Sequence, residues 1–380
     1  MKIVHICMIA YIDGWGYQDN LLPEYMANAG HDVVVITNNN KFPSYLHIDE
    51  RNRILEKGDN YYDGKVKVYR IPIGLATSNY AFICRGLTRI LKKEQPDVIF
   101  HHGVNSSSMI ICCNYVRKHR YVKFFVDNHA DMLNQSSNVL WNKIITRGLM
   151  RLCICITNQY ITKYYGVTPG RCEYLETIYG ADSSKINLMP IGCDTNRIDN
   201  ISDNIKDLRQ KYRIPLSSRV ICSGGKMGAQ KGTLSLIKAF RKLCLEGNDL
   251  CLILFGRFLD EETQLLASQT NGVHIFGWCD RITTLELLKL SDIGCWPIHH
   301  TTLIEDSIGS SLPLIVRRTS NTEHLIQNNG EFVSNGNEDE LYNVLKNMCI
   351  NLSMYKDGAK VVKDQFSYNN IVKQFEKDCN

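Results

Sequence analysis

Short apolar runs of strand length alternate with stretches of helical period along almost the whole chain of 380 residues. Seven such runs come before a polar interval at residues 194–218, and six come after it. Alternation of this kind predicts βαβ units, in which parallel strands form a sheet and helices cover its faces. Because the polar interval interrupts the alternation, we expect two such sheets, joined near residues 195–215.

The strands and helices expected from this pattern define an α/β fold of two Rossmann-like domains. A cleft between two such domains is a common place for a ligand. The strands expected of the first sheet are residues 3–10, 32–37, 66–71, 97–102, 122–128, 152–157 and 186–191. Those of the second sheet are residues 219–223, 250–255, 273–276, 292–297, 312–316 and 331–333. Expected helices include residues 20–29, 80–93, 107–118 and a last helix at 368–377.

The composition is that of a globular protein with a mild positive charge. Hydrophobic residues make up 44% of the chain and the formal net charge is +5, which suits an anionic substrate or a membrane surface without requiring nucleic acid. Most of the 15 cysteines lie in apolar runs, so we expect small core residues of a reduced compartment rather than disulfides. We see no signal-peptide pattern and no apolar run near the roughly 20 residues that span a bilayer, and we expect a cytoplasmic protein.

Two lysines follow the first strand of the second domain, in the segment CSGGKMGAQKGT. Gly225 allows a tight exit from the strand, and Lys226 and Lys231 precede a helix. Loops after parallel strands open at the carboxyl edge of the sheet, where ligands of α/β proteins bind. Two cations beside a helix N-terminus at this edge predict a diphosphate site. The Walker A pattern is absent, so this is not a P-loop.

A single acid occupies the loop and short helix of the segment CWPIHHTTLIEDSIGSS. Glu305 lies near the start of the expected helix, and Thr301, Thr302 and Leu303 come just before it. A carboxylate there can accept hydrogen bonds from the vicinal hydroxyls of a sugar ring, while the helix start offers amides to phosphate. The combination predicts a nucleotide.

The first domain has three loops of interest at its sheet edge. Gly14 and Gly16 follow the first strand and allow close approach of a ligand, although the dinucleotide fingerprint is not met. His129 and Asp131 follow the strand at residues 122–128. The pair at residues 101–102 follows another strand, and for it we expect a structural or surface role. No HxxxH or HExxH spacing supports a metal site, and we expect none.

The stretch at residues 139–165 is apolar with interspersed cations such as Lys143, Arg147 and Arg151. One interpretation is a helix that touches an anionic membrane, where a lipid-linked sugar acceptor lies. The other is an ordinary helix and buried strand of the fold. The first interpretation would bring the protein to the inner face of the membrane.

Five segments in order resemble those of the retaining glycosyltransferases of family 4, which have the GT-B fold of two Rossmann-like domains facing each other across a cleft. The resemblance extends over almost the whole chain. The matching segments are GHDVVVIT (residues 30–37), QPDVIFHHG (95–103), KINLMPIGCD (185–194), SGGKMGAQKGTLSLIKAF (223–240) and VHIFGWCDRITTLELLKLSDI (273–293).

The resemblance implies an acceptor-binding domain at residues 1–200 and a donor-binding domain at 201–364, with a helix near 365–380 that packs back on the first. It also implies a nucleotide-sugar donor, with UDP expected before GDP, and no metal cofactor. Donor-binding positions carried over from the family are Gly16, Gly225, Lys226, Lys231, Trp278, Cys279, Thr301, Thr302, Leu303 and Glu305. Catalytic roles fall to His129, Lys226, Lys231 and Glu305, and acceptor-side roles to Gly14 and Asp131.

Two positions depart from the family pattern. The usual pair of acids is eight positions apart, and Pro297 stands where the first acid is expected, eight before Glu305. Lys226 replaces the usual arginine, which keeps the charge but loses the bidentate fork.

The expected function is sugar transfer to a glycan or lipid-linked acceptor in cell-surface polysaccharide biosynthesis. A catalytically silent GT-B protein that binds nucleotide or glycan, a GDP-sugar transferase and a sugar-nucleotide epimerase of the same fold remain alternatives.

Overall fold

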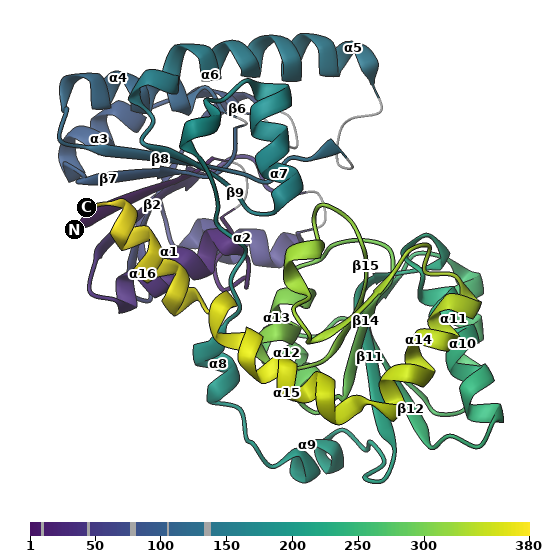
Figure 1. The fold of residues 1–380 in the computed structure, drawn as a ribbon. Helices are drawn as coiled ribbons and strands as arrows, with labels where there is room; N and C mark the ends of the chain where they lie inside the picture. The colour runs from purple at the N-terminus through teal and green to yellow at the C-terminus, as the bar shows by residue number, and fades with distance from the viewer. Residues whose placement is uncertain (9–10, 44–45, 77–80, 105, 133–137) are drawn as a thin grey trace. The chain divides into compact units, whose positions relative to one another are not determined.

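The computed structural model describes residues 1–8, 11–43, 46–76, 81–104, 106–132 and 138–380. The chain forms two compact units, Met1–Pro190 with Ile371–Asn380, and Ile191–Asn370. Each unit is built around one main sheet, and the helices lie on its faces (Figure 1). The mixed α/β fold with two Rossmann-like sheets confirms the predicted class.

The first unit contains an eight-stranded sheet in the order β10-β9-β8-β7-β1-β2-β4-β3. Its strand neighbours are parallel except for β3 and β4, which form an antiparallel edge. The strands are β1 (Lys2–Cys7), β2 (Asp32–Asn38), β3 (Asn60–Asp63), β4 (Val66–Ile71), β7 (Val98–His101), β8 (Lys123–Asn128), β9 (Lys163–Gly166) and β10 (Ile186–Leu188), with a separate hairpin of β5 (Ile73–Ala76) and β6 (Ala81–Cys84).

The helices of this unit connect its parallel strands. The longer ones are α1 (Gln18–Asn28), α2 (Ile48–Glu56), α3 (Leu87–Glu94), α4 (Ser108–Lys118), α6 (Arg151–Thr157) and α7 (Pro169–Tyr174). Short α5 (Val139–Trp141) and the π-helical segment η2 (Asn142–Met150) run directly into α6, and Figure 1 draws the three as one long helix. The last helix, α16 (Tyr368–Asp378), brings the chain back to this unit at Ile371.

The second unit contains a six-stranded parallel sheet in the order β13-β12-β11-β14-β15-β16. Its strands are β11 (Arg219–Met227), β12 (Leu250–Phe258), β13 (Val273–Phe276), β14 (Ile293–Trp296), β15 (Leu314–Arg317) and β16 (Gly330–Val333). Its helices are α8 (Thr195–Asp199), α9 (Ile205–Lys211), α10 (Thr233–Leu245), α11 (Glu261–Ser268), α12 (Arg281–Lys289), α13 (Leu303–Gly309), α14 (Glu338–Ile350) and α15 (Leu352–Lys363). If the six strands are numbered by their occurrence in the chain, their spatial order in the sheet is 3-2-1-4-5-6. This is the strand order of a doubly wound nucleotide-binding sheet.

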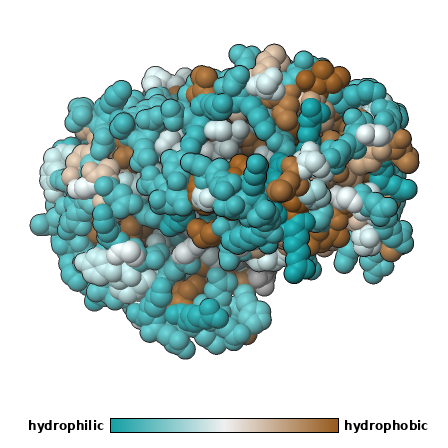
Figure 2. Space-filling view, turned by 90° about the horizontal axis from the view of Figure 1, so that it is seen from below, coloured by the Kyte–Doolittle hydropathy of each residue, from teal (hydrophilic) through white to brown (hydrophobic). Residues whose placement is uncertain are grey.

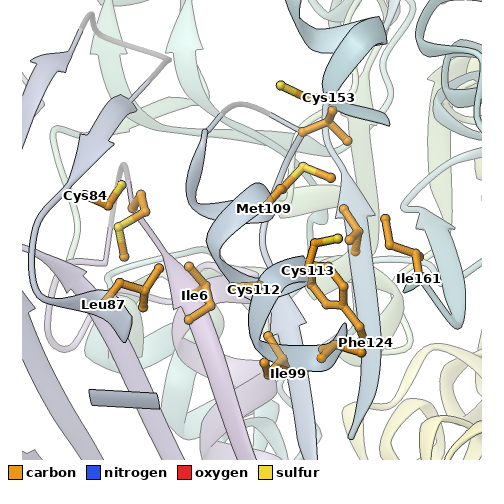
Figure 3. Close-up of a cluster of buried hydrophobic side chains, with 14 of the residues drawn as sticks. Ile6, Cys84, Leu87, Ile99, Met109, Cys112, Cys113, Phe124, Cys153 and Ile161 are labelled. Atoms are coloured by element: carbon orange, nitrogen blue, oxygen red, sulfur yellow. The ribbon is translucent and has the colours of Figure 1, made fainter. Parts of the chain in front are cut away.

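Cysteines are part of the apolar core, as the sequence predicted. All fifteen lie among the described residues and are free thiols. Figure 3 shows Cys84, Cys112, Cys113 and Cys153 among apolar side chains such as Met109. Burial raises the pKa of the Cys251 thiol to about 12, so such thiols stay protonated and unreactive at neutral pH.

Hydrophilic residues cover most of the face drawn in Figure 2, and the apolar side chains on it form small separate groups. Among the described residues, no helix is both long and apolar enough to cross a membrane.

Two predicted elements are wrong, both in the first unit. Residues 152–157 were expected to be a strand but belong to α6, because a short apolar run satisfies a helix with one buried and one exposed face as well as a strand. The expected helix at 80–93 begins outside the described residues, and its described part, residues 81–93, is instead β6, a turn and then α3. The strand β9 was not recognised.

The chain also changes unit earlier than the predicted boundary at residue 200, between Pro190 and Ile191. The reason is that Cys193, Ile198 and Ile201 pack in the core of the second unit. At the other end, Phe375 is fully buried against the rings of Phe100 and Phe125 in the first unit.

Candidate functional site

The strand order of the second sheet reverses between β11 and β14. From β11 the chain proceeds outward to β12 and β13, and then returns to the other side of β11 as β14. Connections leave the two central strands in opposite directions there, which opens a crevice at their carboxyl ends. The two segments that the sequence analysis singled out in this unit follow these two strands, at Met227 and Trp296.

Glycines allow two backbones to approach closely at the end of β11. Gly225 and Gly256 are paired in register, both with positive φ, at 96° and 117°. A Cβ atom on Gly256 would lie 2.1 Å from the carbonyl oxygen of Gly225. The ordered strand therefore continues through Gly225 and Lys226 to Met227 instead of ending at residue 223 as predicted.

Lys226 and Lys231 are brought close enough to repel each other. Burial and the charge of Lys226 both lower the pKa of the Lys231 ammonium. Burial and the Lys231 charge likewise lower the pKa of His299, and Arg317 adds to this effect. Like charges held together at a sheet edge cost free energy, which an anionic ligand would recover.

Pro297, which stands in place of the expected acid, is packed between two glycine turns. A Cβ atom on Gly232 (φ +79°) would lie 2.6 Å from Pro297 Cγ, and one on Gly336 (φ +63°) would lie 2.5 Å from the Pro297 carbonyl oxygen. The loop after β14 is thereby held against the start of α10. Position 297 is therefore part of the scaffold of this loop.

Glu305 is fully buried in the first turn of α13. Its Oε1 atom lies 2.6 Å from Nε2 of His300, while Oε2 has no hydrogen-bond partner among the described residues. An unsatisfied buried carboxylate oxygen is costly. It is therefore the kind of acceptor that a ligand hydroxyl would satisfy.

The start of α13 lies next to the end of β11. Thr301 and Thr302 precede Leu303, the first residue of the helix, and a Cβ atom on Gly225 would lie 3.4 Å from Leu303 Cδ1. The structure thus brings together Gly225, Leu303 and the start of the helix that carries Glu305.

A buried ion-pair network that no sequence motif indicated supports α13. Arg281 makes a bidentate pair with Asp306 and also lies 3.5 Å from Asp194. Burial, together with the charges of Asp194 and Glu305, raises the pKa of the Asp306 carboxyl even though Arg281 opposes that rise. A bidentate arginine that holds the neighbour of Glu305 fixes the orientation of the helix.

The residues expected near the base follow β13. Trp278 is 78% exposed, and the Cys279 thiol donates to the carbonyl oxygen of Phe276 at 3.4 Å. An aromatic face exposed at a sheet edge can stack on a base. The Cys279 thiol is thus engaged in a hydrogen bond within its own turn.

In the first unit, the strand order reverses between β1 and β7. Five side chains converge at this point: Cys7 at the end of β1, Asp19 in α1, His102 after β7, Asp127 at the end of β8, and His129. Nδ1 of His102 lies 2.9 Å from Asp127 Oδ2 and 3.2 Å from Asp19 Oδ1. Nε2 of His129 lies 3.3 Å from the same Asp127 oxygen.

The cluster is strongly polarised. Burial by itself would lower the pKa of His102, but Cys7, Asp127 and Asp19 raise it well above its ordinary value. The His102 and His129 rings hold the pKa of Asp127 well below its usual range despite complete burial. Perturbed groups of this kind at a topological switch point mark a candidate site.

The other predicted residues of this unit differ in their surroundings. Gly14 is exposed and has φ +75°, and Gly16 is half-buried before α1. Asp131 is 3% exposed and lies 3.3 Å from Arg171 Nε, which fits a scaffold role better than contact with an acceptor.

His102 was expected to have a structural or surface role but lies at the centre of the cluster. Asp127, Asp19 and Cys7 were not predicted as site residues. Each stands at or just after the carboxyl end of a strand next to the reversal, apart from Asp19 in the following helix. A prediction of the strand order would have identified these residues, because the order decides which strand ends are neighbours in the sheet.

Comparisons with known proteins agree with this architecture. The sequence profile of Glycosyltransferase Family 4 matches residues 21–197. No curated protein matches the sequence significantly. A glycosyltransferase from Rickettsia africae ESF-5 has a similar structure at 17% identity and TM-score 0.70, covering 100% of this chain and 97% of that protein.

Two further solved structures have been determined with nucleotides. Anabaena Alr3699/HepE in complex with UDP is 14% identical with TM-score 0.70, covering 99% of each chain. A UDP-GlcNAc 2-epimerase from Neisseria meningitidis bound to UDP-GlcNAc is 13% identical with TM-score 0.61, covering 100% of this chain and 99% of that one. At such identities the likeness is one of fold.

The two sheets and these neighbours define a GT-B protein. The profile match confirms the resemblance to family 4 that the motifs indicated. Residues 21–197 therefore match a domain of Glycosyltransferase Family 4, and the chain has the fold of these glycosyltransferase structures.

The packing of Pro297 against Gly232 can be tested with Gly232→Ala. We expect the free energy of unfolding to fall by about 2–4 kcal/mol, because the new Cβ both strains a left-handed backbone and overlaps the Pro297 ring. The measurement is urea unfolding followed by circular dichroism.

Gly247→Ala is the matched control, since Gly247 has φ +86° and nothing within 4 Å of an added Cβ. Its cost should be that of the backbone strain alone, about 1–2 kcal/mol. Equal losses in the two variants would show that the contact with Pro297 does not constrain the loop.

Proposed function

We propose that the protein is a retaining glycosyltransferase that takes a sugar from a UDP-sugar and transfers it to a lipid-linked glycan acceptor. The observation that carries the proposal is the juxtaposition, at the switch point of the second sheet, of repelling lysines with a buried acid that has an unsatisfied oxygen. A nucleoside diphosphate has the complementary groups, namely anionic phosphates and a ribose diol. The UDP complex of Anabaena HepE supports the choice of base.

Departure of the nucleoside diphosphate builds negative charge on the leaving oxygen. Lys226 and Lys231 stabilise that charge, and they do so more strongly in a desolvated site than in water. Glu305 accepts hydrogen bonds from the ribose hydroxyls through Oε2, and His300 holds its other oxygen. Gly225 lets the β11 backbone approach the phosphates. Thr301, Thr302 and Leu303, at the start of α13, lie on the opposite side of the diphosphate. Trp278 stacks on the base, and Cys279 shapes the turn below it.

The family resemblance supplies the remaining steps. The acceptor hydroxyl attacks from the face that the leaving group vacates, and a phosphate oxygen takes its proton, which gives retention. His129 contacts the transferred sugar, and Gly14 and Gly16 allow the first loop to approach the phosphates. With two lysines at the diphosphate, this part of the site needs no metal ion.

A helical surface of the first unit supports a lipid-linked acceptor. The face of η2 and α6 that carries Thr146, Met150, Cys153, Ile154 and Thr157 is buried. Its opposite face carries an apolar stripe at four-residue spacing. The stripe consists of the exposed side chains Leu140, Ile144, Leu152 and Ile156.

Cations lie beside the apolar stripe. Lys143, Arg147 and Arg151 are exposed one position before Ile144, Gly148 and Leu152. An apolar stripe next to a row of cations matches the interface of a bilayer that contains anionic lipids. We therefore propose peripheral attachment to such a membrane, where a lipid-linked acceptor is available.

The ribose assignment can be tested with Glu305→Gln and two ligands. The parent should bind UDP about 10- to 100-fold more tightly than 2′-deoxy-UDP, because loss of the hydroxyl leaves a buried carboxylate unpaired. Glu305→Gln should bind UDP more weakly and discriminate much less between the two. Titration calorimetry measures all four affinities.

Glu261→Gln on the surface of α11 is the control and should behave as the parent. Lys231→Met should weaken UDP binding while leaving uridine unaffected, which separates the diphosphate contact from the ribose contact. Full discrimination between UDP and its 2′-deoxy form in Glu305→Gln would contradict the ribose assignment.

The catalytic proposal predicts UDP release from at least one UDP-sugar when a lipid-linked acceptor is added, with the anomeric configuration of the donor kept in the product. Coupled detection of UDP and NMR of the product measure the two quantities. Turnover with GDP-sugars alone would assign the other donor class. Tight UDP binding without turnover across donors and acceptors would identify a silent binding protein.

The membrane proposal predicts that Ile144→Asp/Leu152→Asp reduces binding to phosphatidylglycerol vesicles by more than about tenfold, since each buried aliphatic side chain contributes about 1.5–3 kcal/mol. Cosedimentation with anionic and with pure phosphatidylcholine vesicles measures it. Leu245→Asp is the control, because Leu245 is 87% exposed on another unit. Equal binding of all three proteins would contradict the attachment surface.

A further inference from the structure

Two adjacent histidines in the loop after β14 have different surroundings. The His300 side chain is 8% exposed and lies 2.6 Å from Glu305, whereas His299 is exposed. We propose that His299 is a third cationic group for the diphosphate, and that it takes up a proton when a nucleoside diphosphate binds. This role rests on the donor site proposed for the second unit, and it makes donor binding dependent on pH.

The strand order brings His299 to the same edge of the sheet as the other cations. β14 lies between β11 and β15, and Trp296 at the end of β14 pairs with Val316, the residue before Arg317. The loop that carries His299 therefore leaves the sheet between the end of β15 and the loop after β11, which carries Lys231. Three neighbouring strand ends thus supply cations at one carboxyl edge, where ligands of such sheets bind.

Close packing holds the loop of His299 against the turn that carries Lys231. A Cβ atom on Gly232 would lie 2.6 Å from Pro297 Cγ and 2.9 Å from Ile298 Cγ1. Gly232 directly follows Lys231, and Ile298 directly precedes His299. Backbone packing therefore places His299 beside Lys231 before any ligand binds.

The cations around His299 favour its neutral form in the free protein. Burial lowers the pKa of His299, and the charges of Lys231 and Arg317 lower it further, although the backbone carbonyl of Gln230 opposes this effect. At neutral pH the imidazole is therefore largely uncharged, and it adds little to the repulsion between the neighbouring cations.

The carboxylates of the neighbouring elements are directed at other groups. Glu305 of α13 lies against His300. Asp260 accepts from the backbone N–H of Ala229 in the short segment η6 (Ala229–Lys231). Glu340 of α14 accepts from the backbone N–H groups of residues 334–336, the turn that packs on the loop after β14. An anionic ligand would therefore bring negative charge directly to the cations at this edge.

The hydrogen-bonding capacity of imidazole explains why an anion would bind together with a proton. A neutral imidazole has one N–H and one nitrogen lone pair. The Gln230 carbonyl oxygen attracts the N–H, so the other nitrogen presents its lone pair, which repels a phosphate oxygen. A proton on that nitrogen replaces the repulsion by a charge-assisted hydrogen bond. The bound diphosphate also offsets the charges of Lys231 and Arg317, so both effects raise the pKa of His299 in the complex.

The sign of the pH dependence follows from this change. His299 is neutral in the free protein and protonated in the complex, so the affinity for the diphosphate rises as the pH falls through the pKa of the complex. The affinity levels off below the pKa of the free protein, where His299 is charged in both states. A terminal phosphate titrates near a pH of about 6 itself, so UDP should be studied between about pH 7 and pH 9.

The experiment is titration calorimetry of the full chain with UDP, in HEPES and in Tris, which differ in their enthalpy of ionisation. The difference in the observed binding enthalpy gives the number of protons taken up. We expect the parent to take up about half a proton or more per UDP at about pH 7.5. Its affinity for UDP should fall about threefold to tenfold between about pH 7 and pH 9.

Substitutions of His299 separate its charge from its titration. His299→Gln keeps a hydrogen-bond donor but cannot become charged, so proton uptake should vanish and UDP should bind about fivefold more weakly at about pH 7. The difference from the parent should shrink toward higher pH. His299→Lys is charged throughout this range, so it should restore tight binding without proton uptake. His274→Gln on β13 is the matched control, because burial alone lowers the pKa of His274, and it should take up protons as the parent does.

Two results would overturn the role of His299 while leaving the donor site in place. One is UDP binding by the parent without proton uptake. The other is proton uptake by His299→Gln that equals that of the parent and of His274→Gln. A parent protein that does not bind UDP at all would contradict the donor site itself, and the role of His299 with it.

Discussion

The reversal of strand order at the centre of each sheet is the constraint on which the chemistry of this protein depends. In the second unit it lies between β11 and β14, and in the first unit between β1 and β7. Only there do neighbouring parallel strands send their connections in opposite directions, so that backbone and side chains are left facing an opening. The lysines and Glu305 gather at one reversal, and the His102 cluster at the other.

Close backbone packing turns these openings into defined sites. Gly225 and Gly256 allow β11 and β12 to remain paired up to the lysine-bearing turn, and Gly232 and Gly336 seat Pro297. The proline that replaces the expected acid is therefore a packing residue, and the bidentate pair of Arg281 with Asp306 holds α13. Rigidity at this edge places Glu305 before any ligand arrives, which favours binding because little has to be ordered afterwards.

The two clusters face opposite electrostatic problems. Lys226 and Lys231 form a concentration of positive charge that an anion relieves, whereas the negative charge of Asp19 and Asp127 is balanced by His102 between them. A fold shared by transferases and a 2-epimerase provides both kinds of edge, and side chains at the strand ends choose the chemistry.

Much of the fold could be predicted from the sequence, and so could the residues that we propose for the donor side. Strand-length apolar runs predicted the two parallel sheets, and glycine, lysine and acid spacing pointed to Gly225, Lys226, Lys231 and Glu305, because these signals are local. The helix at residues 151–157 could not be told from a strand, since its exposed apolar face hides the helical period. Only the tertiary structure brings together Cys7, Asp19, His102 and Asp127. The reason is that the order of strands in the sheet, and not their order in the chain, decides which strand ends are neighbours.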